Sequence, residues 1–332
     1  MEVALKVVYN VALLFILMVP GVIMKKCHLS TDGFGKGLSN LILYVAQPAL
    51  VFLAYVRPYD QKIFLNSIYV FALSIVAHII FSVVALSFFK KAPDGRKRML
   101  RVATIFSNAA FMGIPLIAAA LGQEATLYAS IYNITFNIFL WSLGVKICTD
   151  NRDTNNNGVD DYDENKELAK KTKHRKGASP LKALYHPVTI AAAVGLVFFL
   201  LPIHENIPAI LNDTFDRLAA LVAPLSMVVI GLRLADMNFK GMLTDKYMYL
   251  FLALRHVVLP LTVVLVVKLC GLLLPIAPEV GMVAVILAST PAATSTTMFA
   301  EMYDCDASYV SRIVTVSTLL SILTMPVILL LM

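Results

Sequence analysis

Long apolar runs alternate with short polar segments along nearly the whole chain. A helix needs about 20 apolar residues to cross a bilayer, and ten runs approach or exceed that length. They lie at residues 3–24, 37–56, 63–89, 99–121, 124–147, 183–201, 207–235, 246–274, 279–302 and 307–331. The pattern predicts an all-α polytopic membrane protein with ten transmembrane helices.

The longest polar stretch, residues 148–182, separates the first five runs from the last five. We therefore expect residues 1–147 and 183–332 to form two five-helix units joined by a polar linker. Because five crossings are an odd number, the second unit starts from the opposite side of the membrane. The two units are thus predicted to be inverted repeats, an arrangement common among secondary transporters.

Two of the runs contain a proline where a membrane helix should be continuous, at Pro115 and at Pro291. An interior proline removes a backbone hydrogen bond, and the freed carbonyls need cover from protein or a water-filled cavity. An interval of 67 residues separates Pro48 from Pro115, and the same interval separates Pro224 from Pro291. We expect helices 4 and 9 to be broken at these equivalent prolines, which is typical of a transporter binding site.

Composition and charge support this class of protein. The chain has 332 residues, of which 59% are hydrophobic and 15% charged, whereas soluble domains have about 45–50% and about 25%. Its net charge of +7 comes mainly from Lys and Arg in the linker and the loops after odd-numbered runs. This positive-inside bias places the linker in the cytoplasm and both termini outside the cell membrane, and it argues against a nucleic-acid partner.

The sequence contains no motif for an enzyme or an ATP-driven pump. A Gly-x-x-x-x-Gly-Lys-Ser/Thr loop, a His-Glu-x-x-His pair and an aspartate pair within the runs are all absent. We therefore predict no catalytic residue and no cofactor. The leading hypothesis is a secondary transporter that works by alternating access, and the alternatives are a membrane sensor or a channel.

The linker contains one pattern that resembles a metal site. Its spacing matches an EF-hand calcium loop, in which carboxylate and amide oxygens surround the ion. The candidate ligands are Asp153, Asn155, Asn157, Asp161 and Glu164. The alternative is a solvated linker, which is favoured because Asp160 stands where such loops usually have an apolar residue.

Three segments together resemble the auxin efflux carrier family. Residues 103–144 contain Ser-Asn-Ala-Ala-Phe-Met-Gly-Ile-Pro, residues 223–235 contain Ala-Pro-Leu-Ser-Met and Ile-Gly-Leu-Arg-Leu-Ala, and residues 317–326 contain Ser-Thr-Leu-Leu-Ser and Thr-Met-Pro. The family includes plant PIN-type auxin exporters and bacterial permeases for malate, malonate and related acids. The short linker is more similar to the prokaryotic members.

The resemblance implies a scaffold domain of spans 1, 2, 6 and 7 and a transport domain of spans 3–5 and 8–10. In that arrangement helices 4 and 9 unwind and cross at Pro115 and Pro291, and the transport domain moves against the scaffold as in an elevator mechanism. The implied substrate is a small organic anion, such as a dicarboxylate or an auxin-like carboxylate. A sodium-coupled transporter of a different organic solute is the alternative, and a homodimer through the scaffold helices is expected.

Polar residues in the apolar runs, together with glycine and proline at the breaks, are the candidates for substrate contacts. A polar group in hydrocarbon needs a hydrogen-bond partner, so the alternative for each polar side chain is a tie between helices. The candidates are Gln47, Asn108, Gly113, Pro115, Asn133, Asn137, Arg255, Ser289, Thr290, Pro291 and Thr294. Asn137 is preferred over Asn133 because it should lie deeper, and Arg255 is expected to bind the anion or pair with an acid.

Three further residues are candidates for coupling transport to an ion. His78 lies within the third run, and Glu301 and Asp304 lie where the ninth run meets the tenth. Each has an ordinary alternative, which is packing for His78 and an exposed loop charge for the acids. Proton coupling, sodium coupling and uniport all remain open at this stage.

Overall fold

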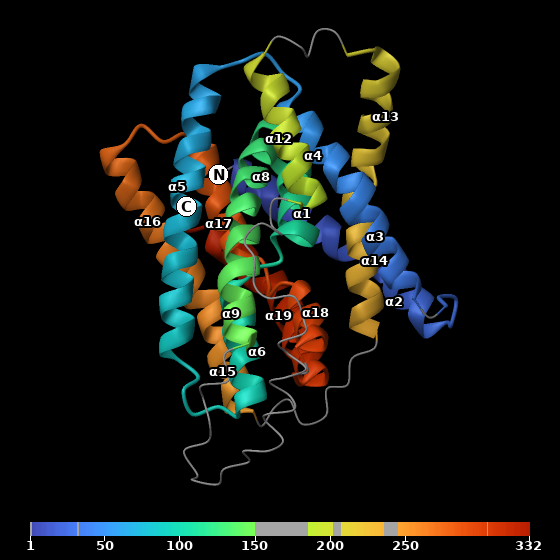
Figure 1. Cartoon of the computed structure of the whole chain (residues 1–332), viewed down its shortest axis with the longest axis vertical. Helices are drawn as coiled ribbons and strands as arrows, with labels where there is room; N and C mark the ends of the chain where they lie inside the picture. Colours follow the sequence, from blue (N-terminus) through green and yellow to red (C-terminus); the bar gives the residue numbers. More distant parts are fainter. Residues whose placement is uncertain (1, 32, 150–184, 202–206, 236–244, 304) are drawn as a thin grey trace.

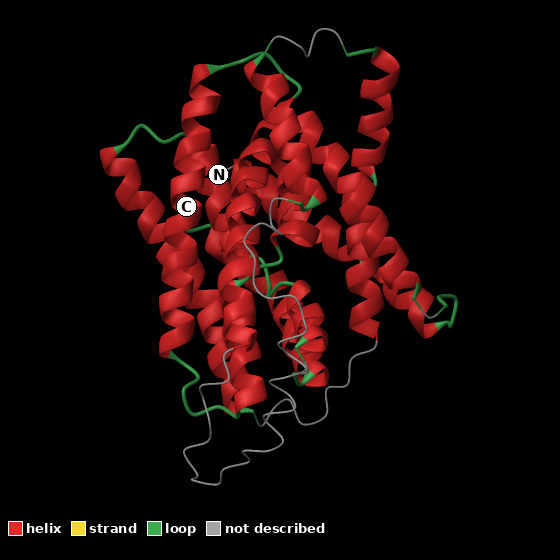
Figure 2. Cartoon of the chain, in the orientation of Figure 1, coloured by secondary structure: helices red, strands yellow, loops and turns green. Residues whose placement is uncertain are grey.

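The computed structural model describes residues 2–31, 33–149, 185–201, 207–235, 245–303 and 305–332 (Figure 1). Every regular element in these ranges is a helix, and Figure 2 draws no strand among them. The calcium-loop candidates at residues 153–164 and the coupling candidate Asp304 fall outside the described ranges. The all-α prediction is therefore confirmed for the described chain.

Seven stretches of helix in the described chain are long and apolar enough to cross a membrane. They correspond to predicted spans 1, 2, 3, 5, 7, 8 and 10. Their elements are α1 (Glu2–Ile16) with α2 (Val19–Lys26), α3 (Phe34–Leu41) with η1 (Ile42–Ala46) and α4 (Gln47–Tyr55), α5 (Gln61–Ser87), α8 (Gln123–Phe139) with η3 (Leu140–Gly144) and α9 (Val145–Thr149), α13 (Ala209–Ala220) with α14 (Val222–Ala235), α15 (Lys246–Ala253) with η5 (Leu254–Val258) and α16 (Leu259–Leu273), and α19 (Ala307–Leu329). The chain is a polytopic membrane protein.

The other three predicted spans form shorter helices. Two of them are interrupted, and the third is a single helix of 14 residues. The elements are α6 (Asp94–Ile105), η2 (Ala109–Gly113) and α7 (Ile114–Leu121) in span 4, α12 (Pro187–Leu200) in span 6, and α17 (Pro278–Ser289) and α18 (Ser295–Met302) in span 9. The predicted interruption of spans 4 and 9 is thus present, although its position in span 4 differs from the prediction.

Short π-helical turns, the η elements, explain why several prolines do not break their helices. In three of the four η elements of the described chain, a proline follows two residues after the turn ends: Pro48 after η1, Pro115 after η2 and Pro260 after η5. A π-turn bonds each N–H to the carbonyl five residues back and is wider than an α-turn. The wider turn keeps the preceding carbonyls clear of the proline ring, so the helix continues through the proline.

Glycines bring the backbones of α2 and α14 into contact. A Cβ atom on Gly231 would lie 2.0 Å from the Met18 carbonyl oxygen, and one on Gly21 would lie 2.2 Å from the Val228 oxygen. Small residues allow such close packing between membrane helices, where water provides no hydrophobic driving force. The backbones of spans 1 and 7 are therefore in direct contact at these glycines.

The contacts between helices fall mainly into two groups. In one group α2 packs on α14, and α4 packs on both α12 and α13. In the other group α5 packs on α6, α8 and α17, and α19 packs on α17 and α18. Figure 1 shows α2, α3, α13 and α14 along one side of the molecule and α5 and α16 along the other.

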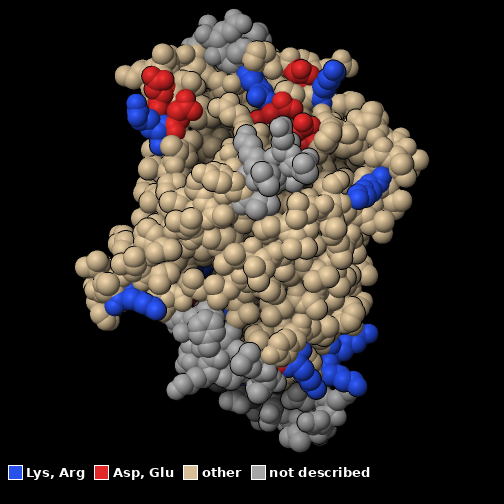
Figure 3. Space-filling view, turned by 180° about the vertical axis from the view of Figure 1, so that it is seen from behind, with Lys and Arg blue, Asp and Glu red and all other residues tan. Residues whose placement is uncertain are grey.

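Charged side chains gather toward the two ends of the long axis on the face shown in Figure 3. The belt between these ends is largely uncharged on that face. Many large apolar side chains of the described chain are exposed, including Phe71, Ile79 and Val83 on α5. Exposed leucine, isoleucine and phenylalanine in such a belt match hydrocarbon rather than water. The belt is the surface expected to face lipid.

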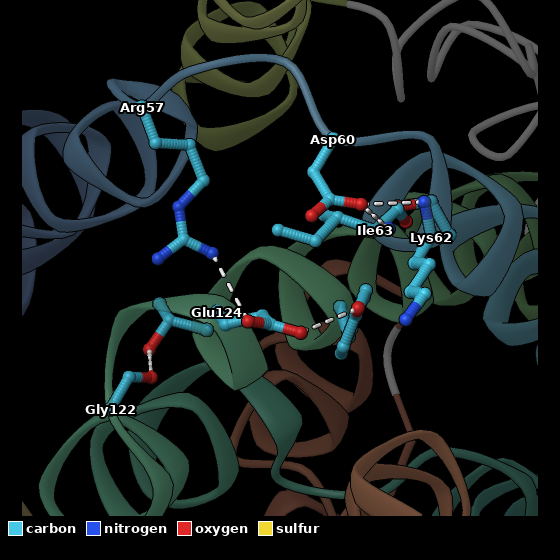
Figure 4. A network of polar contacts seen from close by, with 9 residues as sticks. Arg57, Asp60, Lys62, Ile63, Gly122 and Glu124 are labelled. Carbon is cyan, nitrogen blue, oxygen red and sulfur yellow. Dashed lines mark hydrogen bonds and ion pairs between the residues drawn. The ribbon is translucent and has the colours of Figure 1, made fainter. Parts of the chain in front are cut away.

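A polar network at one end of the molecule ties the loop after α4 to α8 (Figure 4). The guanidinium of Arg57 lies 3.6 Å from the carboxylate of Glu124, and the hydroxyl of Tyr128 donates to the same carboxylate at 2.9 Å. Asp60 caps the N-terminus of α5 by accepting from the N–H of Lys62 at 2.6 Å. These charges are partly exposed, in contrast to the polar groups of the interior.

Candidate functional site

The interruptions of spans 4 and 9 cross in the interior of the protein. An isolated antiparallel bridge pairs Ser107 with Ala292. Two backbone hydrogen bonds join the breaks, from the N–H of Asn108 to the oxygen of Pro291 and from the N–H of Ala293 to the oxygen of Phe106, both at 2.8 Å. Each break thereby satisfies backbone groups of the other, which is required where no water is available.

The crossing corrects one prediction about the prolines. Helix 4 is broken at Ser107 and Asn108, and Pro115 lies in the second half-helix beyond the π-turn. Pro291 lies within the other break as predicted. The two prolines are therefore not at equivalent positions, and the equal intervals from Pro48 and Pro224 do not mark the crossing. Pro115 is tolerated because the π-turn before it relieves the clash and helix 4 has already restarted.

Arg255 binds the C-terminal ends of the two half-helices that enter the crossing, α6 and α17. Its side chain is fully buried and makes four hydrogen bonds, all to backbone carbonyls. They run to Thr104 (3.2 Å), to Ala288 (2.9 Å) and to Thr290 (3.2 and 2.7 Å). A helix C-terminus carries a partial negative charge, so this cation compensates two such ends at once.

No carboxylate of the described residues forms an ion pair with Arg255. Its guanidinium also lies 5.8 Å from the centre of the Phe81 ring. The predicted pairing of Arg255 with an acid is therefore not seen in the described chain, where its four hydrogen bonds go to backbone carbonyls. That Arg255 contacts a substrate anion stays a prediction.

A second chain of contacts supports the crossing from α19. The hydroxyl of Ser317 accepts from the N–H of Ala292 at 2.9 Å. His256, the neighbour of Arg255, bonds to Ser317 through Nε2 at 2.8 Å and to Thr324 through Nδ1 at 3.0 Å. The turn that contains Arg255 and the helix that contains Ser317 thus hold the same break from two directions.

The N-terminal ends of the half-helices that leave the crossing, η2 and α18, are treated differently. Asn108 precedes η2 and Thr294 precedes α18, and neither side chain caps its helix. The amide nitrogen of Asn108 and the hydroxyl of Thr296 are buried and have no hydrogen-bond partner within the described chain. Polar atoms in such a position are available to a ligand. The partial positive charge of a helix N-terminus favours an anion there.

Neighbouring helices bring more polar atoms toward η2. The amide nitrogen of Gln47 donates to the carbonyl of Ala110 at 2.8 Å, and its amide oxygen is buried without a described partner. Ala110 lies five residues before Pro115, which has no N–H to offer at that π-turn spacing. Ser226 on α14, a helix that packs on η2, is also buried with an unpaired hydroxyl.

The two asparagines of α8 differ from each other. The amide nitrogen of Asn137 donates to the carbonyl of Asn133 at 3.0 Å within the helix. The amide oxygen of Asn133 is buried and has no described partner. Helix α8 lies beside the crossing, because it packs against η2, and a substrate contact by either asparagine stays a prediction.

The two hydroxyls just before the second break bond to backbone carbonyls of their own helix. Ser289 donates to the carbonyl of Val285 at 2.7 Å, and Thr290 donates to that of Leu287 at 2.9 Å. Thr294 is buried and accepts at its carbonyl from Thr297. Gly113 lies opposite this segment, where a Cβ atom would meet the Leu287 side chain at 2.4 Å. Gly113 therefore permits close packing of η2 on α17.

The coupling candidates lie in contrasting places. His78 is buried on α5, where its Nδ1 bonds to the Ser74 carbonyl at 2.7 Å. Five aromatic rings surround it, those of Phe81, Phe106, Tyr132, Phe136 and Phe139. Glu301 is exposed, as its ordinary alternative predicts, but it lies in helix α18 rather than in a loop.

Sequence reasoning did not single out Ser226 or the role of Ser317. A serine or threonine within an apolar helix usually bonds the carbonyl of its own preceding turn, so residue type alone gives no signal. The signal for Ser317 lies in its spatial position opposite Ala292, 25 residues away in the sequence.

The described geometry is that of a membrane protein built around two crossed, interrupted helices. A comparison with curated proteins finds no match. A family model described as membrane transport protein matches residues 6–329, nearly the whole chain. The chain therefore belongs to the membrane transport protein family of the auxin efflux carrier type.

Proposed function

We propose that the protein is a secondary transporter of a small organic anion, with the binding site at the crossing of spans 4 and 9. The observation that supports this most directly is the pair of uncapped half-helix N-termini beside unpaired buried donors, the Asn108 amide and the Thr296 hydroxyl. Each N-terminus carries roughly half a positive charge. Two such N-termini at the same crossing favour the binding of a carboxylate.

The substrate class rests on the family and on this electrostatic setting. A dicarboxylate or an auxin-like carboxylate offers an anionic group for the N-terminal ends. The unpaired oxygens of Gln47 and Asn133 are suited to accept hydrogen bonds from hydroxyl or N–H groups on the remainder of the substrate. Malate and indole acetate each carry such a group.

The division of contacts supports alternating access. The group built from α2, α4, α12, α13 and α14 matches the expected scaffold, and the group of α5, α6, α8, α17 and α19 matches the expected transport domain. We propose that the second group carries the crossing across the membrane against the first. Ten spans in two inverted five-helix repeats, with a cytoplasmic linker and both termini outside, complete the proposal.

Transport by purified protein in liposomes tests the function. We expect uptake of at least one radiolabelled anion from a panel of malonate, malate, other dicarboxylates and indole acetate. Asn108→Ala should lower that uptake roughly tenfold or more, because a hydrogen bond to a charged group is lost. Asn40→Ala, which changes an exposed asparagine on α3, is the matched control and should transport normally.

Two outcomes would contradict the proposal. One is the absence of uptake across the whole panel by protein that is folded in the liposomes. The other is ion conductance that does not saturate with anion concentration, which would indicate a channel. Full uptake by Asn108→Ala would still be consistent with transport, but it would show that the binding site does not lie at the crossing.

A further inference from the structure

Four half-helix ends meet at the crossing, and their partial charges are not compensated in the same way. The two C-terminal ends, at Ile105 of α6 and Ser289 of α17, direct carbonyl groups into the protein interior. Such orphan carbonyls require donors or a cation. Some are satisfied locally, since Phe106 donates to Val102 and Thr290 donates to Ile286.

Arg255 binds three of the remaining carbonyls, on both half-helices. These oxygens come from segments 151 residues away in one case and 33 to 35 residues away in the others. A guanidinium has five N–H donors and stays protonated in proteins, so the site always contains one positive charge. Its burial is complete and no carboxylate of the described chain pairs with it.

Broken-helix transporters use the same kind of oxygens for another purpose. Unwound carbonyls and the C-terminal ends of half-helices coordinate a coupling cation such as Na⁺. In this protein the corresponding oxygens are already bound by a covalently attached cation. A free cation brought to the same place would face both the repulsion of the guanidinium and a shortage of unoccupied oxygens.

We propose that Arg255 is a resident cation of the crossing, which takes the place of a bound coupling cation and makes binding of Na⁺ at these carbonyls unnecessary. The part of the inference that concerns coupling rests on the proposed transport function. The cation site itself is a property of the fold and is tested without substrate.

The neighbourhood of Arg255 fixes it in this role. Arg255 lies in η5, a π-turn followed by Pro260, and π-turns occur often at functional sites. Its neighbour His256 is bonded to Ser317 and Thr324 on α19. The turn is thus attached to α19 as well as to both breaks, so the guanidinium is positioned before any ligand arrives.

Thermal unfolding of the purified protein in detergent tests the resident cation. The variants are Arg255→Ala, Arg255→Gln and Arg255→Lys, with Arg217→Ala as the matched control because Arg217 is exposed on α13. The unfolding temperature is measured in choline chloride, in NaCl and in choline chloride with millimolar methylguanidinium, at one ionic strength. A ligand that binds only the folded state raises this temperature with its concentration.

We expect wild type and Arg217→Ala to show no response to NaCl or methylguanidinium. Arg255→Ala and Arg255→Gln should unfold at lower temperature and be stabilised by methylguanidinium in a saturable manner. Arg255→Lys should unfold above Arg255→Gln, because it keeps the charge although it reaches fewer carbonyls. Binding of radioactive Na⁺ should be absent in wild type.

Three results would overturn the inference. They are saturable Na⁺ binding or stabilisation in wild type, equal or greater stability of Arg255→Gln relative to Arg255→Lys, and no methylguanidinium response by folded Arg255→Gln. If Arg255→Ala does not fold, the comparison of the Gln and Lys variants decides alone. Failure of anion uptake affects none of these measurements, whereas uptake by wild type that requires Na⁺ would refute the coupling claim directly.

Discussion

The two sides of the helix crossing are organised in opposite ways. On the side where α6 and α17 end, Arg255 occupies the carbonyls with four hydrogen bonds. On the side where η2 and α18 begin, no side chain of the described residues caps the helices, and donors at Asn108 and Thr296 are buried without a partner among those residues. One side is complete without a ligand, and the other side is not.

Under the proposed function, this difference separates residues that stabilise the fold from residues that bind the substrate. The closed side satisfies the backbone that a broken membrane helix leaves exposed, which is a requirement for folding. The open side retains the positive ends of two helix dipoles for a ligand. We therefore expect substitutions on the two sides to have different consequences, and the following predictions test that expectation.

The largest effect is expected from a fixed negative charge on the open side. Asn108→Asp introduces a carboxylate of nearly the same shape, and aspartate is a favourable N-cap, so the protein should fold. A like charge costs several kcal/mol at a binding site, and uptake of the anion should fall at least ~100-fold. Anion uptake into liposomes measures this fall, with Asn40→Asp as the control. Normal uptake by a stable Asn108→Asp protein would place the anion elsewhere.

A smaller effect is expected from the contact between Ser317 and the second break, and it should appear in stability rather than in affinity. Ser317→Ala leaves the buried N–H of Ala292 without its acceptor, which costs about 1–3 kcal/mol. The unfolding temperature should fall accordingly. Ser321→Ala is the matched control because Ser321 is equally buried on α19 and bonds only to the carbonyl of Thr318.

Equal unfolding temperatures for Ser317→Ala and Ser321→Ala would contradict the assignment of Ser317 to the crossing. Uptake per folded Ser317→Ala molecule should remain close to wild type. A selective loss of uptake without a loss of stability would place Ser317 on the binding side instead.

The contact of Gln47 with η2 should show coupling to Pro115. Gln47→Met removes the donor to the Ala110 carbonyl, and Pro115→Ala returns a backbone N–H to the same turn. The double-mutant cycle should therefore give a coupling energy of about 0.5–3 kcal/mol. Unfolding temperatures of the wild type, both single variants and the double variant supply the cycle. Strict additivity would show that Gln47 does not compensate for the proline.

The smallest effect is expected in the partly exposed network of Arg57, Glu124 and Tyr128 at one end of the molecule. Arg57→Gln removes the ion pair with Glu124, whose atoms lie 3.6 Å apart and are partly exposed. Exposed ion pairs contribute about 0–1 kcal/mol, so the unfolding temperature should hardly change. A fall in unfolding temperature as large as that of Arg255→Gln would show that the ion pair of Arg57 with Glu124, rather than the crossing, holds the two helix groups together.

Much of the architecture follows from the sequence. All ten predicted apolar runs contain helix, with boundaries that agree within several residues where the chain is described. The runs that contain Pro115 and Pro291 are the two whose interruptions cross. Arg255 was identified from its depth in a run, because a charge in hydrocarbon needs a specific partner. These inferences depend on residue type and run length alone.

The details of the site did not follow in the same way. Pro115 indicated a break eight residues away from the bridged residue Ser107, since a π-turn accommodates this proline and the bridge to Ala292 fixes the break at Ser107. The preference for Asn137 over Asn133 stays a prediction. The position of the break depends on a partner that lies far away in the sequence, at Ala292, and on a type of turn that the sequence does not show.

The sequence by itself determined an all-α membrane protein with interrupted helices and a buried arginine, because these features follow from apolar length, proline chemistry and the cost of charge in hydrocarbon. The tertiary structure decided where the interrupted helices cross, and it assigned Arg255 to their C-terminal ends and left the N-terminal ends open. The reason is that every exposed backbone group in a membrane must be satisfied. The chain satisfies the groups at this crossing with donors that only folding brings within reach.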